Sequence, residues 1–151
     1  MTTQQRAAPT ERYLGPVPAP QQESDFYWEK CKQHELWLRY CNHCSKAYFY
    51  PRDICPNCFS RKTTWVKASG KGTLYTFAIV HQAQVSLARA SAQQSPQPYI
   101  IALVKLEEGP IFPTNIVNVE PDPKNLKIGM PVTVVFEDIT EAITLPKFKL
   151  G

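Results

Sequence analysis

The chain has 151 residues, of which 43% are apolar, and its formal net charge is +4. This length accommodates one ordinary domain or two small ones, and the fourteen prolines argue against a long helical bundle. No apolar run approaches the roughly 18 residues of a membrane-spanning helix, and the N-terminus lacks the apolar core of a secretory signal. We therefore expect a cytoplasmic protein built mainly from short strands.

The N-terminal segment, residues 1–23, contains four prolines and four glutamines but few apolar side chains. Such a composition offers too little apolar surface to offset the entropy lost on folding. We therefore predict that this segment is an extended, mostly disordered, proline-rich arm.

A short helix is predicted within residues 24–37, running from about residue 25 to residue 35. Ser24 suits the N-cap position, and Asp25 suits the first turn. The helix presents three consecutive aromatic residues, and two interpretations of them remain open: the rings pack on the neighbouring module, or they dock into another protein. The candidate partner-binding residues are Phe26, Tyr27 and Trp28.

Two C-x-x-C pairs, ten residues apart, lie in residues 38–63. A tight C-x-x-C turn directs two sulfurs toward one metal ion, and two such turns complete a tetrahedron. In a reducing cytoplasm these pairs are better interpreted as metal ligands than as disulfides. The pattern predicts a zinc ribbon with a structural, coordinatively closed Zn²⁺ site, the alternatives being a rubredoxin-like iron site and a non-metal arrangement. The predicted ligands are Cys41, Cys44, Cys55 and Cys58.

No complete catalytic set is evident in the chain. The fifth cysteine, Cys31, has neither a nearby base nor a glycine-rich elbow, so we interpret it as a packing thiol or a free thiol. The sequence contains no G-x-S-x-G, no H-E-x-x-H and no glycine-rich phosphate loop.

Five strand-length runs follow Gly70, and residues 64–151 are predicted to form a small closed or partly open five-stranded OB-fold barrel. Alternation in the first run places Tyr75, Phe77 and Ile79 on one face. The long connection of residues 82–98 would lie at the mouth of such a barrel, where it is either mobile or ordered by a partner. The runs are residues 72–81, 99–108, 111–119, 130–139 and 142–150.

The middle of the chain is basic, since residues 64–100 contain three Lys/Arg and no Asp/Glu. A basic barrel mouth would suit a phosphate-bearing ligand, although each of these side chains is also compatible with a solvated surface charge. The candidate residues for such an entrance are Arg52, Lys67, Lys71, His81 and Arg89.

The order of these motifs resembles a family of small bacterial and archaeal proteins, formerly labelled a domain of unknown function and linked to acyl-CoA metabolism. The resemblance spans roughly residues 24–149, and it rests on the segments DFYWE, YPRDICPNC, GKGTLYTFAIVH, PYIIALVKLEEGP and LKIGMPVTVVFED. It implies an N-terminal helix, a rubredoxin-like zinc ribbon and an OB-fold, with the four cysteines as zinc ligands and the helix around Phe26 as the docking element.

The resemblance also implies a partner, because family members assemble with thiolase-like enzymes, either thiolases or aldolases. The expected function is a non-catalytic accessory subunit that stabilises such a hetero-oligomer and helps form the entrance for coenzyme A or its acyl thioester. The chain would then be part of an acyl-CoA C-acyltransferase complex. It is compatible with the small subunit of a benzoylsuccinyl-CoA-type thiolase and with other acyl-CoA thiolase partners.

Two further functions remain open from the residues alone. Zinc ribbons and OB-folds both occur in proteins that bind single-stranded nucleic acids, with aromatic residues stacking on bases. The low net charge and the lack of Lys/Arg clusters argue against this alternative. Electron transfer by an iron-loaded ribbon is the weaker third hypothesis.

Overall fold

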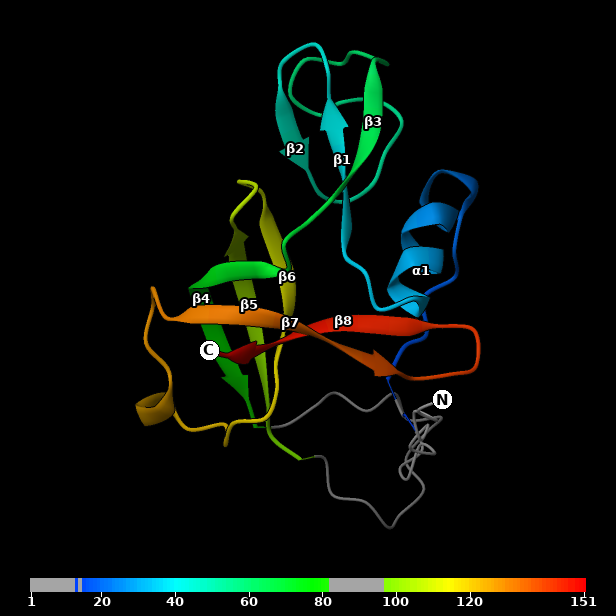
Figure 1. The fold of residues 1–151 in the computed structure, drawn as a ribbon. Coiled ribbons are helices and arrows are strands. Elements are labelled where there is room, and N and C mark those ends of the chain that lie inside the picture. Colours follow the sequence, from blue (N-terminus) through cyan, green and yellow to red (C-terminus); the bar gives the residue numbers. More distant parts are fainter. Residues whose placement is uncertain (1–12, 14, 82–96) are drawn as a thin grey trace, which may run out of the picture.

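The computed structural model describes residues 13, 15–81 and 97–151, which form a helix, a small sheet and a barrel (Figure 1). The predicted long connection therefore lies largely outside the described residues, and Arg89 lies entirely outside them. Within the described part, no helix is long and apolar enough to cross a lipid bilayer.

The single α-helix of the described residues, α1 (Asp25–Lys32), follows the 3₁₀ turn η1 (Gln22–Ser24). Ser24 occupies the N-cap position as predicted, but its hydroxyl donates to the carbonyl of Gln21 at 3.1 Å and does not cap α1. The helix ends before residue 35 because His34 adopts a left-handed φ of 60°. There the N–H of His34 donates to the carbonyl of Cys31, and the N–H of Glu35 to that of Lys30, as in a Schellman motif.

The ribbon is a three-stranded antiparallel sheet with the order β2-β1-β3. Its strands are β1 (Trp37–Cys41), β2 (Lys46–Tyr48) and β3 (Thr63–Lys67). Since β3 pairs with β1 along its whole length, the predicted boundary between residues 63 and 64 falls inside a strand of the ribbon. The last residues of the predicted arm also have defined contacts here, because the Glu23 carboxylate accepts from Arg52 at 2.8 Å.

The barrel is closed, with the strand order β4-β5-β6-β8-β7, which confirms the predicted mainly β fold with a five-stranded OB barrel. Four of its five strand pairs are antiparallel, and β6 pairs with β8 in parallel. The strands are β4 (Lys71–Val80), β5 (Tyr99–Leu106), β6 (Ile111–Ile116), β7 (Pro131–Asp138) and β8 (Thr144–Leu150), with the 3₁₀ turn η2 (Pro123–Asn125) before β7.

The prediction that Tyr75 shares a face of β4 with Phe77 and Ile79 is wrong, because the pairing register with β5 shifts between Leu74 and Thr76. This β-bulge leaves Tyr75 without a cross-strand partner and reverses the alternation that follows. Leu74 is buried before the bulge, Tyr75 is 54% exposed within it, and Phe77 after it packs against the core on the same side as Leu74. A strict period of two cannot reveal this extra residue.

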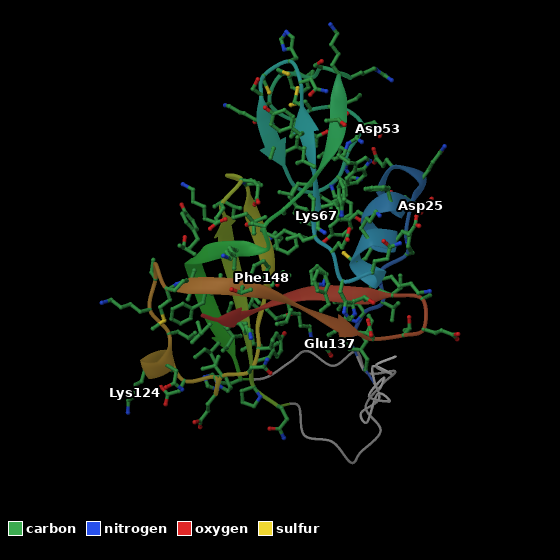
Figure 2. All side chains as sticks on the ribbon, viewed as in Figure 1. Asp25, Asp53, Lys67, Lys124, Glu137 and Phe148 are labelled. Atoms are coloured by element: carbon green, nitrogen blue, oxygen red, sulfur yellow. The ribbon has the colours of Figure 1, made fainter. Side chains whose placement is uncertain are left out.

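The helix, the ribbon and the barrel share one hydrophobic core. Tyr27 of α1 and Leu38 of β1 are each 1% exposed and belong to the same cluster as Val104, Phe112 and Phe148 of the barrel. Phe49, after β2, joins the two parts because its ring lies 4.3 Å from that of Phe112. The three predicted segments are therefore packed into one unit, and Figure 2 shows Phe148 within the barrel.

Candidate metal centre and contact surfaces

The four predicted cysteine ligands converge at the end of the ribbon opposite the barrel (Figure 1). The Sγ atoms of Cys41 and Cys58 lie 3.6 Å apart, those of Cys44 and Cys55 lie 3.7 Å apart, and all four lie within 4.8 Å of one another. A tetrahedron with metal–sulfur bonds of about 2.3 Å has edges of about 3.8 Å. The thiols therefore fit a single tetrahedral metal ion and are too far apart for disulfides.

Two knuckles of the same design hold these sulfurs. In the first, which spans Cys41 to Ser45, the N–H of Ser45 donates to the carbonyl of Cys41 at 2.9 Å; in the second, the N–H of Phe59 donates to the carbonyl of Cys55 at 2.9 Å. Ser45 and Phe59 both adopt a left-handed backbone, with φ of 56° and 60°. The paired turns direct backbone N–H groups at the sulfurs, as the C-x-x-C spacing predicts.

At Cys55, the backbone N–H groups stabilise the thiolate form that a metal requires. Burial raises the pKa of Cys55, but hydrogen bonds from the backbone N–H groups of Cys58 and Asn57, together with those from the side chains of Cys44 and Cys41, outweigh burial and lower the pKa to about 6. The donor set of four sulfurs leaves no position for water or substrate, which is the property of a structural zinc site. Zn²⁺ bound here would tie the end of β1 and the turn that follows it to the loop between β2 and β3 through all four cysteines.

The aromatic residues of α1 pack within the chain, as the first of the two open interpretations predicts. The ring of Tyr27 is buried against Phe49 and Tyr50, so the structure moves Tyr27 from the docking set to the core. Phe26 and Trp28 are half-buried. Phe26 lies 4.7 Å from the ring of Trp65, and the indole N–H of Trp28 donates to the Tyr50 hydroxyl at 3.2 Å. A docking role for these two partly exposed rings stays a prediction.

The four candidate entrance residues that the structure describes do not converge. Lys71 begins β4 and His81 follows its last residue, so about ten residues of extended strand, roughly 30 Å, separate them. Arg52 belongs to the ribbon, where it pairs with Glu23, and Lys67 on β3 pairs with Glu35 at 3.0 Å. Figure 2 shows Lys67 where the ribbon meets the barrel. These positions do not surround one opening.

An apolar surface on the second knuckle is not evident from the sequence pattern alone. Phe59 is 78% exposed, Ile54 is 41% exposed, and Pro56 between them is also exposed. They line an open hollow of about 410 Å³. The signal was a bulky aromatic residue directly after the second C-x-x-C pair, at a position whose backbone conformation favours small residues.

Two family models match the chain. The ChsH2 rubredoxin-like zinc ribbon domain matches residues 28–64, and the ChsH2 C-terminal OB-fold domain matches residues 65–137. Together they span well over half of the chain, in the order that the structure shows.

Similar proteins include a DUF35 domain-containing scaffold protein of Methanocaldococcus jannaschii, which is 40% identical over 103 residues that make up 67% of each chain. A probable enoyl-CoA hydratase alpha subunit of Thermomonospora curvata is 32% identical over 136 residues, which cover 90% of the present chain. The present chain spans 40% of the length of that relative.

A solved structure described as the Ltp2-ChsH2(DUF35) aldolase contains a chain of the same fold. It superposes with a TM-score of 0.73 at 30% sequence identity, and the match covers 89% of the present chain and 98% of the solved one.

Proposed function

Because the chain belongs to the ChsH2/DUF35 family of zinc-ribbon and OB-fold proteins, we propose that it is a non-catalytic accessory subunit of an acyl-CoA enzyme. The partner is a thiolase-like enzyme, either a thiolase or an aldolase, in a cytoplasmic hetero-oligomer. The chain stabilises that complex and helps form its entrance for coenzyme A. Coenzyme A or its acyl thioester is then a ligand of the complex.

The observation that carries this proposal is the match to 98% of a chain from the Ltp2-ChsH2(DUF35) aldolase at 30% identity. An architecture shared along nearly the whole of that chain favours a shared role. The relatives described as a scaffold and as a hydratase alpha subunit support the same class of role.

The chemistry of the described residues agrees with an accessory role. Four of the five cysteines face one closed metal position, and the fifth, Cys31, is fully buried. A buried thiol whose pKa is raised cannot serve as the nucleophile of acyl transfer. The catalytic groups of the complex would therefore come from the enzyme subunit.

The charge distribution favours a protein partner over a nucleic acid. Three basic side chains of the ribbon are paired with carboxylates: Arg39 with Asp53, Arg52 with Glu23, and Lys67 with Glu35. Pairing within the chain reduces the cationic field that would attract phosphates along a strand.

Co-expression with a thiolase-like enzyme subunit from the same organism tests the proposal. We expect the two proteins to elute together from a gel-filtration column. We also expect the enzyme to lose acyl-CoA turnover or oligomer stability when the chain is omitted. Separate elution together with unchanged turnover would contradict the proposal, as would acyl-CoA turnover by the homogeneous chain alone.

A further inference from the structure

We propose that the second zinc knuckle anchors this chain to its enzyme partner, with Phe59 and Ile54 inserted into an apolar socket flanked by a carboxylate. This inference rests on the proposed function and assigns the contact surface that the accessory role needs. It concerns the ribbon end of the molecule, far from the barrel strands (Figure 1).

The two knuckles provide an internal comparison. Ser45 and Phe59 each follow the second cysteine of a pair, share a left-handed φ, and donate the same 2.9 Å hydrogen bond. The turn of a zinc knuckle therefore requires the same left-handed backbone conformation at both residues. Small or amide-bearing residues adopt it readily, whereas a bulky side chain there is an outlier.

Burial within the chain does little to offset the unfavourable backbone conformation of Phe59. Its side chain is 78% exposed, so the ring buries only a small part of its apolar surface within the chain. A serine satisfies the equivalent position of the first knuckle. A residue that is poor for local backbone energy and poor for burial points to selection for a contact outside the chain.

The surroundings of Phe59 complete a docking patch. Ile54 and Pro56 are exposed beside it, and the three residues border one open hollow of about 410 Å³. Isolated exposed apolar side chains are ordinary, but a cluster that includes an aromatic anchor is typical of protein contacts.

The charged residues that line the hollow indicate which chemical groups the partner brings to it. Arg61 also lines the hollow, and it has no ion-pair partner among the described residues, whereas Arg52 on the same hollow is paired with Glu23. Glu23 and Asp53 lie there too, so the lining contains as many acidic as basic groups. That balance cannot hold a polyanion such as a nucleic acid, but the unpaired Arg61 suits a single carboxylate next to an apolar socket.

The size of the patch favours a larger heterologous interface. Three side chains cover much less than the roughly 800 Å² per partner that a stable interface needs. The patch is therefore one anchor within a wider contact on the enzyme subunit, and it is too small to hold two copies of this chain together.

The test uses the full chain and the enzyme subunit that co-purifies with it, identified by mass spectrometry and then purified alone. Isothermal titration compares wild type with Phe59→Asn, which removes the ring and suits a left-handed backbone. We expect a loss of about 30-fold in affinity, as for an interface hot spot. Zinc content should be unchanged, and the thermal midpoint should be equal to or above that of wild type, because asparagine relieves the backbone.

The matched control is Ile128→Ser, which removes a 63% exposed apolar side chain before β7 and should leave affinity unchanged. If Phe59→Asn loses zinc, Ile54→Ser and Arg61→Glu decide instead, and each should weaken binding while retaining zinc. Full binding by the zinc-loaded variants of the knuckle would overturn this inference and leave the proposed function intact. No binding by the wild-type chain counts against the proposed function itself.

Two other occupants are also tested. Sedimentation velocity of the chain alone would overturn the proposal if wild type formed a dimer that Phe59→Asn dissolved. Titration of a fluorescent oligothymidylate would overturn it if wild type bound and the variant did not.

Discussion

His34 at the end of α1 contacts Asp138 at the end of β7, with 3.0 Å between Nε2 and Oδ1. The imidazole also stacks on Phe136, with the ring planes 2° apart and the centroids at 5.3 Å. The same carboxylate oxygen accepts a 2.6 Å hydrogen bond from the hydroxyl of the buried Thr144. This contact joins the helix to the barrel across 104 residues of sequence.

Replacing Asp138 should loosen this junction. In Asp138→Ala the buried hydroxyl of Thr144 loses its acceptor and His34 loses its partner, so we expect the free energy of unfolding to fall by about 1–3 kcal/mol. His34→Asn suits the left-handed backbone of this position and removes the exposed pair together with the stacking on Phe136, so it should cost about 1 kcal/mol. Urea denaturation of both single variants and the double variant measures the coupling. Equal stability of wild type and Asp138→Ala would refute this role.

The purified chain should contain one zinc ion per molecule by elemental analysis. Cys44→Ala should lose the metal and unfold the ribbon, because the small sheet owes much of its stability to metal binding. Cys31→Ala is the matched control and should keep a full equivalent, since Cys31 lies outside the four-sulfur cluster. Cobalt substitution should give the intense absorbance of a tetrahedral tetrathiolate site. Visible absorbance of the protein as purified would instead indicate an iron-loaded ribbon.

The thiol of Cys31 should be unreactive in the folded protein. Burial raises the pKa of Cys31 to about 12, so only about one molecule in 10,000 carries the thiolate at pH 8. With zinc bound, a colorimetric thiol reagent should therefore react slowly, at a rate that rises with pH and with urea. The Cys31→Ala variant should lack this slow phase. A fast single-thiol reaction in native buffer would show that the helix does not seal this side chain.

Gly72 at the start of β4 should be intolerant of a side chain. A Cβ at this position would lie 2.5 Å from the carbonyl oxygen of Lys105 and 2.7 Å from a methyl group of Val104. Gly72→Ala should therefore destabilise the barrel by about 1–3 kcal/mol. Thr73→Ala, an exposed neighbour on the same strand, is the control and should change thermal stability far less. Equal midpoints for the two variants would mean that β4 and β5 separate at little cost.

Several elements were predictable because their signals are local. The cysteine spacing indicates two metal-binding turns regardless of what surrounds them, and the structure brings the four sulfurs together. The five apolar runs mark the barrel strands, since strand-length patterns bounded by proline and glycine depend on nearby residues. The ends of the predicted runs differ from the observed strands by a few residues.

Other features depend on contacts that sequence distance conceals. The bulge at Tyr75 depends on how β4 pairs with β5, and the burial of Tyr27 depends on Phe49 and Tyr50 reaching α1. Arg52 and Lys67 looked available for phosphates because their partners, Glu23 and Glu35, lie about 30 residues away in sequence. An ion pair formed across such a distance makes a basic side chain less available to a phosphate, and the residues next to it in sequence do not reveal the pair.

The amino-acid sequence by itself determined which thiols meet, how many strands the barrel has and where the helix begins, because each of these follows from residue types at short spacing. Only the tertiary structure decided which rings remain outside. Tyr27 is buried in the shared core, while Phe59, which is also aromatic and has no hydroxyl, stays exposed on a backbone that a smaller residue would prefer. The physical reason is that burial is a property of the packed whole, and it is assigned when the helix, the ribbon and the barrel close around one core.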